Sequence, residues 1–530
     1  MSAFWLVIIS IAAFVIAYAT YGRWLAEQWG VDPSRATPAH ELEDGIDFVP
    51  TKPAVLLGHH FSSIAGAGPI NGPIQAAIFG WVPVLLWIVI GSIFFGGVHD
   101  YGSLVASIRH KGRSIGEVIG INMGRQGKML FSAFAWLTLL LVVAAFTNIV
   151  ASTFATVPEA ASSSMMFIVL AVAFGYLVYR KGVSLTVGTV VGVTLLFICV
   201  YLGRVFPLNL SLNTWIVIMM IYIFVASIAP VWILLQPRDY LNSFLLYAMI
   251  AGSVLGIIIY KPSIQLAPFT GFNVNGQWLF PMLFVTVACG AISGFHSLVG
   301  SGTTSKQLDT EHDAKLIGYG GMLIEGVLAV IALITAAYIS QGELTELLKG
   351  SPVNVFSEGV GVFMTKFGIP FDVGKSFVAL AVSAFALTSL DTATRLNRFI
   401  FQEFFYVEGA KKQSILTNMY VSTGITVVIG GYLALGGFSK IWPIFGSANQ
   451  LLAALSLLAI AVWLKNTGKN YKMLVVPMVF MLIVTLVALI FLIKANIAAG
   501  NWILVIFPAI LFVLALVLAV QGYKIVFAKE

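Results

Sequence analysis

The chain has 530 residues, of which 59% are hydrophobic and only 10% are charged, whereas soluble globular proteins carry about 25% charged residues. This composition excludes an ordinary soluble domain and indicates an integral membrane protein, because runs of roughly 20 apolar residues, enough to cross the hydrocarbon core, recur along the chain. The formal net charge of +7 comes from basic residues distributed in the loops. We interpret these residues as topology signals and expect no nucleic-acid partner.

The apolar runs predict an all-α polytopic protein with about fifteen transmembrane helices in a lipid bilayer. They suggest an additional N-terminal span in 1–22, a first five-helix repeat in 53–203, a second in 215–405, and four accessory spans in 416–530. In chain order the predicted spans cover residues 3–21, 53–79, 81–106, 129–150, 165–180, 183–203, 215–235, 242–260, 279–303, 318–339, 375–400, 416–436, 443–464, 473–494 and 502–522.

Loop charges predict the orientation, because lysine and arginine near span ends stay on the cytoplasmic side. The loops between spans alternate between basic ones and ones with no or one basic residue, except for the longer 340–374, which holds Lys349, Lys366 and Lys375. The alternation requires 53–79 to cross fully, and it places the N-terminus outside and the C-terminus in the cytoplasm. The basic loops carry Arg109, Lys111, Arg113, Arg125 and Lys128, then Arg180 and Lys181, Lys306 and Lys315, Lys411 and Lys412, and Lys465, Lys469 and Lys472.

The second predicted span contains residues that interrupt a helix. Interior glycine costs about 1 kcal/mol and proline about 3 kcal/mol relative to alanine, so a continuous helix is not expected. One interpretation is a kink packed against its neighbours. The other, favoured by the adjacent His59 and His60, is a discontinuous helix whose second half begins near Asn71 and points free N–H groups at an anionic substrate. The interrupting residues are Gly66, Gly68, Pro69, Gly72 and Pro73.

A second interruption is predicted five spans later, in "WIVIMMIYIFVASIAPVWILLQP" (215–237), at Ser227, Ala229 and Pro230. Because five is odd, the two halves would enter the membrane from opposite sides, as in an inverted repeat with its site between the breaks. The predicted substrate-binding residues are therefore His60, Gly66, Gly68, Asn71, Gly72, Ser227 and Ala229.

Ionisable residues inside spans indicate a pathway or a proton relay by default, and imidazoles can carry a coupling proton. Structural alternatives stay open: an i,i+4 pair between Asp391 and Arg395, a local His99–Asp100 hydrogen bond, and helix hydrogen bonds in the hydroxyl-rich run 297–305 instead of sodium coordination against the carbonyls of 65–69. Glu325 could snorkel or pair. The predicted ion- or proton-coupling residues are His59, His99, Asp100, His296, Ser297, Ser301, Thr304 and Asp391.

A divalent metal is a further alternative, since imidazole and carboxylate are common ligands. His60, His99, Asp100 and His296 could supply them, but nothing in their spacing demands a metal, and the two cysteines form no zinc pattern. We predict no cofactor and no resident metal.

Four stretches, "FVPTKPAVLLGHHFSSIAGAGPINGPIQAA", "SIAPVWILLQPRDYLN", "SGFHSLVGSGTTSKQ" and "TSLDTATRLNRFIFQE", resemble signature stretches of the carbon starvation protein (CstA) family. The resemblance covers roughly residues 47–405. It implies a bacterial inner-membrane secondary transporter for peptides or pyruvate, driven by protons, with a leucine-transporter-like fold of five plus five helices.

The leading hypothesis is import of a small carboxylate-bearing nutrient by proton-coupled alternating access, with sodium coupling as the alternative. A channel is disfavoured because the intramembrane ionisable groups are too few and too clustered to line a continuous pore. An enzyme is disfavoured because the chain lacks H-E-x-x-H or a comparable catalytic motif.

Overall fold

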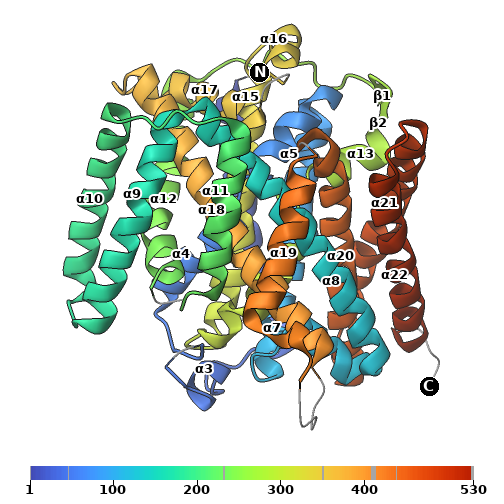
Figure 1. The fold of residues 1–530 in the computed structure, drawn as a ribbon. Coiled ribbons are helices and arrows are strands. Elements are labelled where there is room, and N and C mark those ends of the chain that lie inside the picture. The colour runs from blue at the N-terminus through green and yellow to red at the C-terminus, as the bar shows by residue number, and fades with distance from the viewer. Residues whose placement is uncertain are drawn as a thin grey trace.

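The computed structural model describes residues 2–45, 47–230, 233–348, 351–406, 413–436 and 438–526. The chain forms an upright bundle of helices, and the N-terminus and the C-terminus lie at opposite edges, called here the upper and the lower edge (Figure 1). The upper edge carries a small antiparallel hairpin of β1 (Asn273–Val274) and β2 (Gln277–Trp278). Long apolar sequences form helices here because a helix satisfies its own backbone hydrogen bonds inside a membrane.

Eleven helical stretches among the described residues are long and apolar enough to cross a membrane, and α11 and α19 are shorter apolar helices. Two of the eleven stretches combine two helices each, α1 with α2 and α6 with α7. The helices of the eleven stretches, together with α11 and α19, are α1 (Ala3–Ala19), α2 (Tyr21–Trp29), α6 (Trp81–Gly91), α7 (Gly97–Arg109), α8 (Ile115–Thr156), α9 (Pro158–Gly175), α10 (Leu185–Val205), α11 (Leu212–Ile228), α12 (Leu235–Tyr260), α15 (Gly321–Ala337), α18 (Phe371–Phe405), α19 (Met419–Ala434), α20 (Phe438–Asn466), α21 (Lys472–Ala498) and α22 (Trp502–Val526). The shorter ones are α3 (Pro38–Glu41), α16 (Gln341–Leu347), α17 (Pro352–Thr365), the 3₁₀ turns η1 (Ala77–Phe79), η4 (Thr304–Lys306) and η6 (Ile415–Thr417), and the π-helical turns η2 (Ser92–Gly96), η3 (Tyr176–Arg180) and η5 (Lys315–Gly320).

The interruption predicted in 53–79 is present. Helix α4 (Pro53–Ile64) ends before Ala65, and α5 (Gly68–Ala76) begins after Ala67. The second half therefore starts at Gly68, within one helical turn of Asn71, near which it was predicted to begin. Pro69 occupies the first turn of α5, where a missing N–H costs nothing.

The interruption predicted at Ser227–Pro230 is wrong. Helix α11 ends at Ile228, and α12 returns toward the upper edge from Leu235 (Figure 1), so Pro230 follows a helix end, where proline is common. The second interrupted helix is instead α13 (Leu279–Thr286) followed by α14 (Gly294–Gly302), in a segment predicted as one continuous span. Residues 340–374, predicted as a loop, contain α16 and α17.

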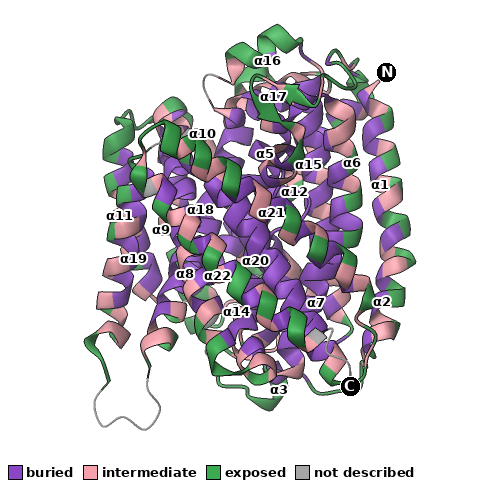
Figure 2. Cartoon of the chain, turned by 90° about the vertical axis from the view of Figure 1, so that its right-hand side faces the viewer, coloured by how far each residue is buried: buried purple, intermediate pink, exposed green. Residues whose placement is uncertain are grey.

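The two interrupted helices lie at the centre of the bundle. Helix α5 packs against α15 and α14 against α7, while α4 packs against α12 and α14 against α20; α8 and α18 cross beside them. Figure 2 shows buried residues filling this centre, with exposed ones on the outer helices. All of the most apolar window of α20 is buried, against 11% of that of α10, so α20 belongs to the core and α10 faces outward.

Helix α8 bends at Gly124, whose φ of 85° lies in the left-handed region that favours glycine. The bend separates a short lower segment beginning at Ile115 from the long segment that crosses the bundle. An ion pair between Glu117 and Lys128 joins the two segments across the bend.

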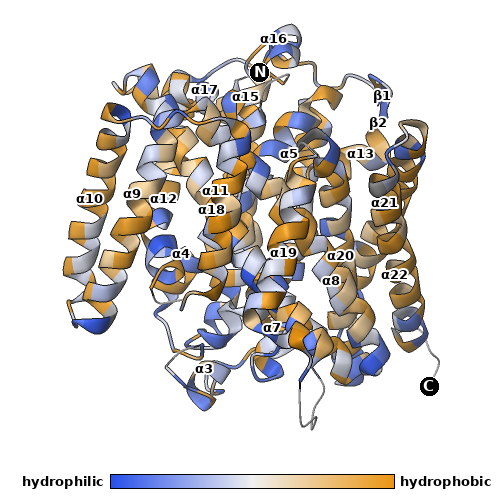
Figure 3. Cartoon of the chain, viewed as in Figure 1, coloured by the Kyte–Doolittle hydropathy of each residue, from blue (hydrophilic) through white to orange (hydrophobic). Residues whose placement is uncertain are grey.

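Hydrophilic residues gather at the two edges, and apolar residues cover the sides of the outer helices (Figure 3). The basic loops around 109–128, 180–181, 306–315 and 465–472 lie at the lower edge with the C-terminus (Figure 1). The predicted basic residues Lys411 and Lys412, and Lys349 in the exceptional loop, lie outside the described residues.

Candidate functional site

A large open cavity of about 1320 Å³ lies at the lower edge. It is bounded by the segment after α3, the α7–α8 connection, the start of α8, the end of α14 and the end of α18. Its wall is more basic than acidic, and is therefore suited to attract anions. The basic residues are Lys111, Arg113, Arg125, Lys128 and Lys306, and the acidic ones are Asp47, Glu117 and Glu403.

The segment after the first span is fastened beside this cavity by Glu311, whose carboxylate accepts from Arg109 Nε at 2.6 Å and from the Asp32 N–H at 2.9 Å. Burial raises the pKa of Glu311, but these bonds outweigh burial and hold the pKa below its ordinary value. Glu311 thus remains charged and paired at neutral pH.

A smaller cavity of about 60 Å³ continues inward from the large one and reaches His59. It carries Arg395, Thr392 and Thr303 in its wall. The two cavities share Asp47, Gly302, Lys306, Leu396 and Phe399. The two cavities therefore adjoin, and the inner one reaches the side chain that precedes the first interruption.

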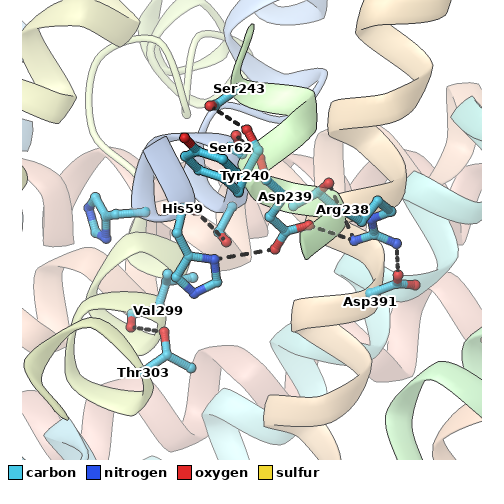
Figure 4. A network of polar contacts seen from close by, with 12 residues as sticks. His59, Ser62, Arg238, Asp239, Tyr240, Ser243, Val299, Thr303 and Asp391 are labelled. Atoms are coloured by element: carbon cyan, nitrogen blue, oxygen red, sulfur yellow. Dashed lines mark hydrogen bonds and ion pairs between the residues drawn. The ribbon is translucent and has the colours of Figure 1, made fainter. Parts of the chain in front are cut away.

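Beyond His59 lies a buried network of charges (Figure 4). His59 Nδ1 is 3.4 Å from Asp239 Oδ2, and Asp239 Oδ1 accepts from Arg238 Nη2 at 2.8 Å. Arg238 Nη1 donates to Asp391, whose Oδ2 also accepts from Tyr222 Oη at 2.8 Å. The side chains of Arg238, Asp239 and Asp391 are at most 2% exposed. The single positive charge of Arg238 thus faces the two negative charges of Asp239 and Asp391. A protonated His59 would supply the second positive charge.

The predicted pair of Asp391 with Arg395 is replaced by other contacts. Asp391 binds Arg238 of α12, while Arg395 Nη2 donates to the carbonyls of Ala226 (2.9 Å) and Ala229. Arg395 therefore caps the end of α11, where carbonyls lack helical partners and a cation is favourable. Two predicted substrate-binding residues lie at this helix end. The Ala229 carbonyl accepts from Arg395, and Ser227 Oγ lies 3.5 Å from Thr423 Oγ1.

A second buried network joins α7, α14 and α15. Asp100 accepts from His99 Nδ1 and from His296 Nδ1, each at 2.7 Å. His296 Nε2 lies 3.3 Å from Glu325 Oε2. The start of α14 is fixed by α20, because Asn449 Oδ1 accepts from the Phe295 N–H at 2.9 Å. The structure thus brings together His99, Asp100 and His296, and it contains the local His99–Asp100 hydrogen bond of the structural alternative.

His60 faces this network without a hydrogen bond to it, and bonds through Nδ1 to Thr304 Oγ1 at 2.8 Å. The other hydroxyls of the run make helix hydrogen bonds: Ser297 donates to the Gly294 carbonyl at 2.7 Å, and Ser301 to the Ser297 carbonyl at 2.6 Å. These are the helix hydrogen bonds that the sequence analysis gave as the alternative to sodium coordination. A sodium role for these residues stays a prediction.

The glycines of the first interruption are required by close packing. A Cβ added at Gly68 would lie 2.4 Å from Cys289 Sγ, and one at Gly72 would lie 2.5 Å from the Thr286 carbonyl oxygen. A Cβ at Gly66 would meet Phe146 at 2.4 Å. A bulky residue at Gly68 would therefore disturb the contact with the second interruption before it could block a ligand. Asn71 is 1% exposed, and neither polar atom of its amide has a partner among the described residues.

Sequence reasoning missed Arg238, Asp239 and Tyr222. Arg238 and Asp239 are signalled by the adjacent pair of charges at the start of an apolar run, in "QPRDYLN", which is costly in a membrane and therefore informative. Tyr222 lies inside an apolar run and has no such signal. Within the described ranges, no group of three or more His, Cys, Asp or Glu side chains is arranged to hold a metal ion.

Two buried charged networks, each with a member on an interrupted helix and one of them bordered by a cavity at His59, are typical of a multi-pass membrane transporter. The family model described as "Carbon starvation protein CstA" matches residues 2–350 and 341–488. The chain belongs to the carbon starvation protein CstA family.

The peptide transporter CstA of Campylobacter jejuni is 33% identical over 92% of this chain and 80% of its own. The pyruvate/proton symporter BtsT of Escherichia coli K12 is 32% identical over 92% of this chain and 81% of its own. Among solved structures, the manganese transporter of Eremococcus coleocola superposes with a TM-score of 0.52 over 91% of this chain and 99% of that one, at 11% identity. That likeness concerns the fold alone.

Proposed function

We propose that this protein is a secondary active transporter that imports small carboxylate-bearing nutrients, peptides or pyruvate, across the bacterial inner membrane by proton-coupled alternating access. The observation that carries the proposal is the pair of adjoining cavities at the lower edge, the inner of which ends at His59, the outermost member of the buried network with Asp239, Arg238 and Asp391. The names of the peptide and pyruvate/proton relatives support both the substrate class and the coupling ion.

The core of the proposed transporter is a five-plus-five inverted repeat with boundaries that differ from the predicted ones. In this revision α4–α5 corresponds to α13–α14, α6–α7 to α15, α8 to α18, α11 to α19 and α12 to α20. Reciprocal packing supports it, since α5 lies on α15 as α14 lies on α7, and α4 lies on α12 as α13 lies on α20. The eleven long and two shorter apolar helices, together with the two interrupted ones, make fifteen crossings.

Within this scheme the substrate carboxylate binds near the first interruption. His60 and the unpartnered amide of Asn71 are the groups that support this placement. The coupling proton is carried by His59 and by the Asp100–His296 network, because these imidazoles are buried and face carboxylates. Sodium remains the alternative ion, with Ser297, Ser301 and Thr304 as its predicted ligands.

The proposed orientation places the lower edge in the cytoplasm, because the basic loops lie there. Reporter fusions after Ser34 and after Lys524 should both report the cytoplasm, and a fusion after Gly276, in the upper hairpin, should report the outside. If the fusions after Ser34 and Lys524 fall on opposite faces, one interrupted helix is re-entrant and the count of fifteen is wrong.

Reconstituted protein tests the function directly. Proteoliposomes with an acidic exterior should accumulate labelled pyruvate or a labelled dipeptide, and dissipating the pH gradient should abolish accumulation. A sodium gradient at equal pH should have no effect, and an empty-liposome control sets the leak. Accumulation driven only by sodium would contradict proton coupling, and accumulation of neither compound under either gradient would contradict the proposed function.

A further inference from the structure

Glu325 of α15 is a buried carboxylate without the hydrogen bonds that a buried charge requires. Its side chain is 0% exposed, and among the described residues neither oxygen has a hydrogen-bond partner. Its Oε2 lies 3.3 Å from His296 Nε2, an atom that also lacks a hydrogen-bond partner among the described residues. A buried ionised carboxylate in this state would be strongly unfavourable.

Asp100 lies on the opposite side of the same imidazole and, unlike Glu325, has hydrogen-bond donors for its carboxylate. It accepts from His99 Nδ1 and His296 Nδ1, so its charge is satisfied by two donors. Because a carboxylate only accepts, His296 carries a proton on Nδ1, and in the neutral ring Nε2 is left with its lone pair facing Glu325.

We propose that Glu325 is a proton-binding site, and that it exchanges its proton with His296 Nε2 during transport; this inference rests on the proposed proton-coupled function. In the step, the O–H bond of the Glu325 carboxylic acid breaks and an N–H bond forms at Nε2. The products are a Glu325 carboxylate and a His296 imidazolium held between two carboxylates. No electron transfer or further reactant is needed, and the reverse step restores the acid.

His60 connects the surroundings of this pair with the lower cavities. The titratable groups that face the pair are Asp100 and His99 of α7, His60 of α4 and the Cys289 thiol between α13 and α14. His60 lies beside Gly321, one helical turn before Glu325, with its Cδ2 3.5 Å from the position of an added Cβ there. Through Thr304, His60 is linked to the segment that lines the lower cavities at Thr303 and Lys306. His296 follows the second interruption directly, so movement of α14 would make or break its contact with Glu325.

A Glu325→Gln variant separates proton coupling from substrate binding. Glutamine keeps the shape of the side chain but holds no exchangeable acidic proton, so pH-gradient-driven accumulation of pyruvate or a dipeptide should be lost. Counterflow exchange of the same compound, with no gradient, should persist at the wild-type rate. Glu325→Asp should recover part of the accumulation. Accumulation by Glu325→Gln at the wild-type level, or loss of exchange together with accumulation in folded protein, would overturn the proposal.

Infrared spectroscopy tests the site without any transported compound. The wild type at neutral pH should show the carbonyl stretch of a protonated, buried carboxylic acid, and Glu325→Gln should lack it. Glu311→Gln is the matched control, because Glu311 is paired with Arg109 and ionised. Absence of the band in the wild type, or its persistence in Glu325→Gln, overturns the proton-binding site even if transport is observed. If the band is observed but neither compound is transported, the result supports the proton-binding site and contradicts the proposed function.

Discussion

Replacing Arg238 with alanine should destabilise the folded protein by about 3–5 kcal/mol, the usual cost of removing one partner from a buried ion pair. The guanidinium lies between Asp239 and Asp391, and all three side chains are at most 2% exposed. Alanine would leave two carboxylates in the membrane interior without a cation. Thermal unfolding in detergent measures the loss, and Arg238→Lys should lose less because it keeps the charge but not the two-pronged contact.

Two comparisons make this result specific. Arg23→Ala removes an exposed i,i+4 pair with Glu27, at 75% and 61% exposure, and should change stability little. Combining Arg238→Met with Asp239→Asn and Asp391→Asn removes every charge of the triad and should restore most of the stability. Unchanged unfolding of Arg238→Ala would mean that the carboxylates are already neutral and that the network is not ionic.

His296→Ala should reduce proton-driven uptake per folded molecule by about 10²-fold, the lower end of what a positioned proton carrier contributes. His296 is the only side chain that contacts both Asp100 and Glu325 among the ion pairs of the described residues. Its removal breaks the link between them. Uptake at pH 7 must be divided by the amount of folded protein, because Asp100 also loses a hydrogen bond worth about 1–3 kcal/mol.

His40→Ala is the matched control for this variant. His40 pairs with Asp309 at 2.8 Å, but the two side chains are 47% and 41% exposed at the lower edge, and uptake should not change. Wild-type uptake by folded His296→Ala would exclude this imidazole from the pathway.

The first interruption could be predicted from sequence because its cause is local. Glycine and proline disfavour a helix wherever they occur, and they cluster at Gly66–Pro73. The second could not be predicted in the same way. Pro230 gives the stronger local signal, yet it follows the end of α11, whereas the real break before Gly294 contains no proline. Whether a weak helix segment breaks or continues there depends on α20, which supplies Asn449 to the new helix end.

The charged network could not be predicted because its members meet only in the folded bundle. Asp391 has Arg395 one turn away, and local spacing favours that pair. In the structure Asp391 instead accepts from Arg238, 153 positions away in sequence. Arg395 is not available to Asp391 because it donates to the carbonyls at the end of α11. Sequence spacing ranks neighbours along one helix and carries no information about which helices are adjacent.

The bend of α8 makes the entrance of the lower cavity sensitive to dissolved salt. Glu117 and Lys128 hold the two segments together across Gly124, both line the cavity, and their side chains are 27% and 30% exposed. Ions screen such partly exposed pairs, with a Debye length near 8 Å at physiological ionic strength and about 3 Å at 1 M. Concentrated salt should therefore loosen the hinge at the entrance while the deeper Arg238 triad, out of reach of water, keeps its attraction. Ionic strength acts on access to the site and hardly on the site itself.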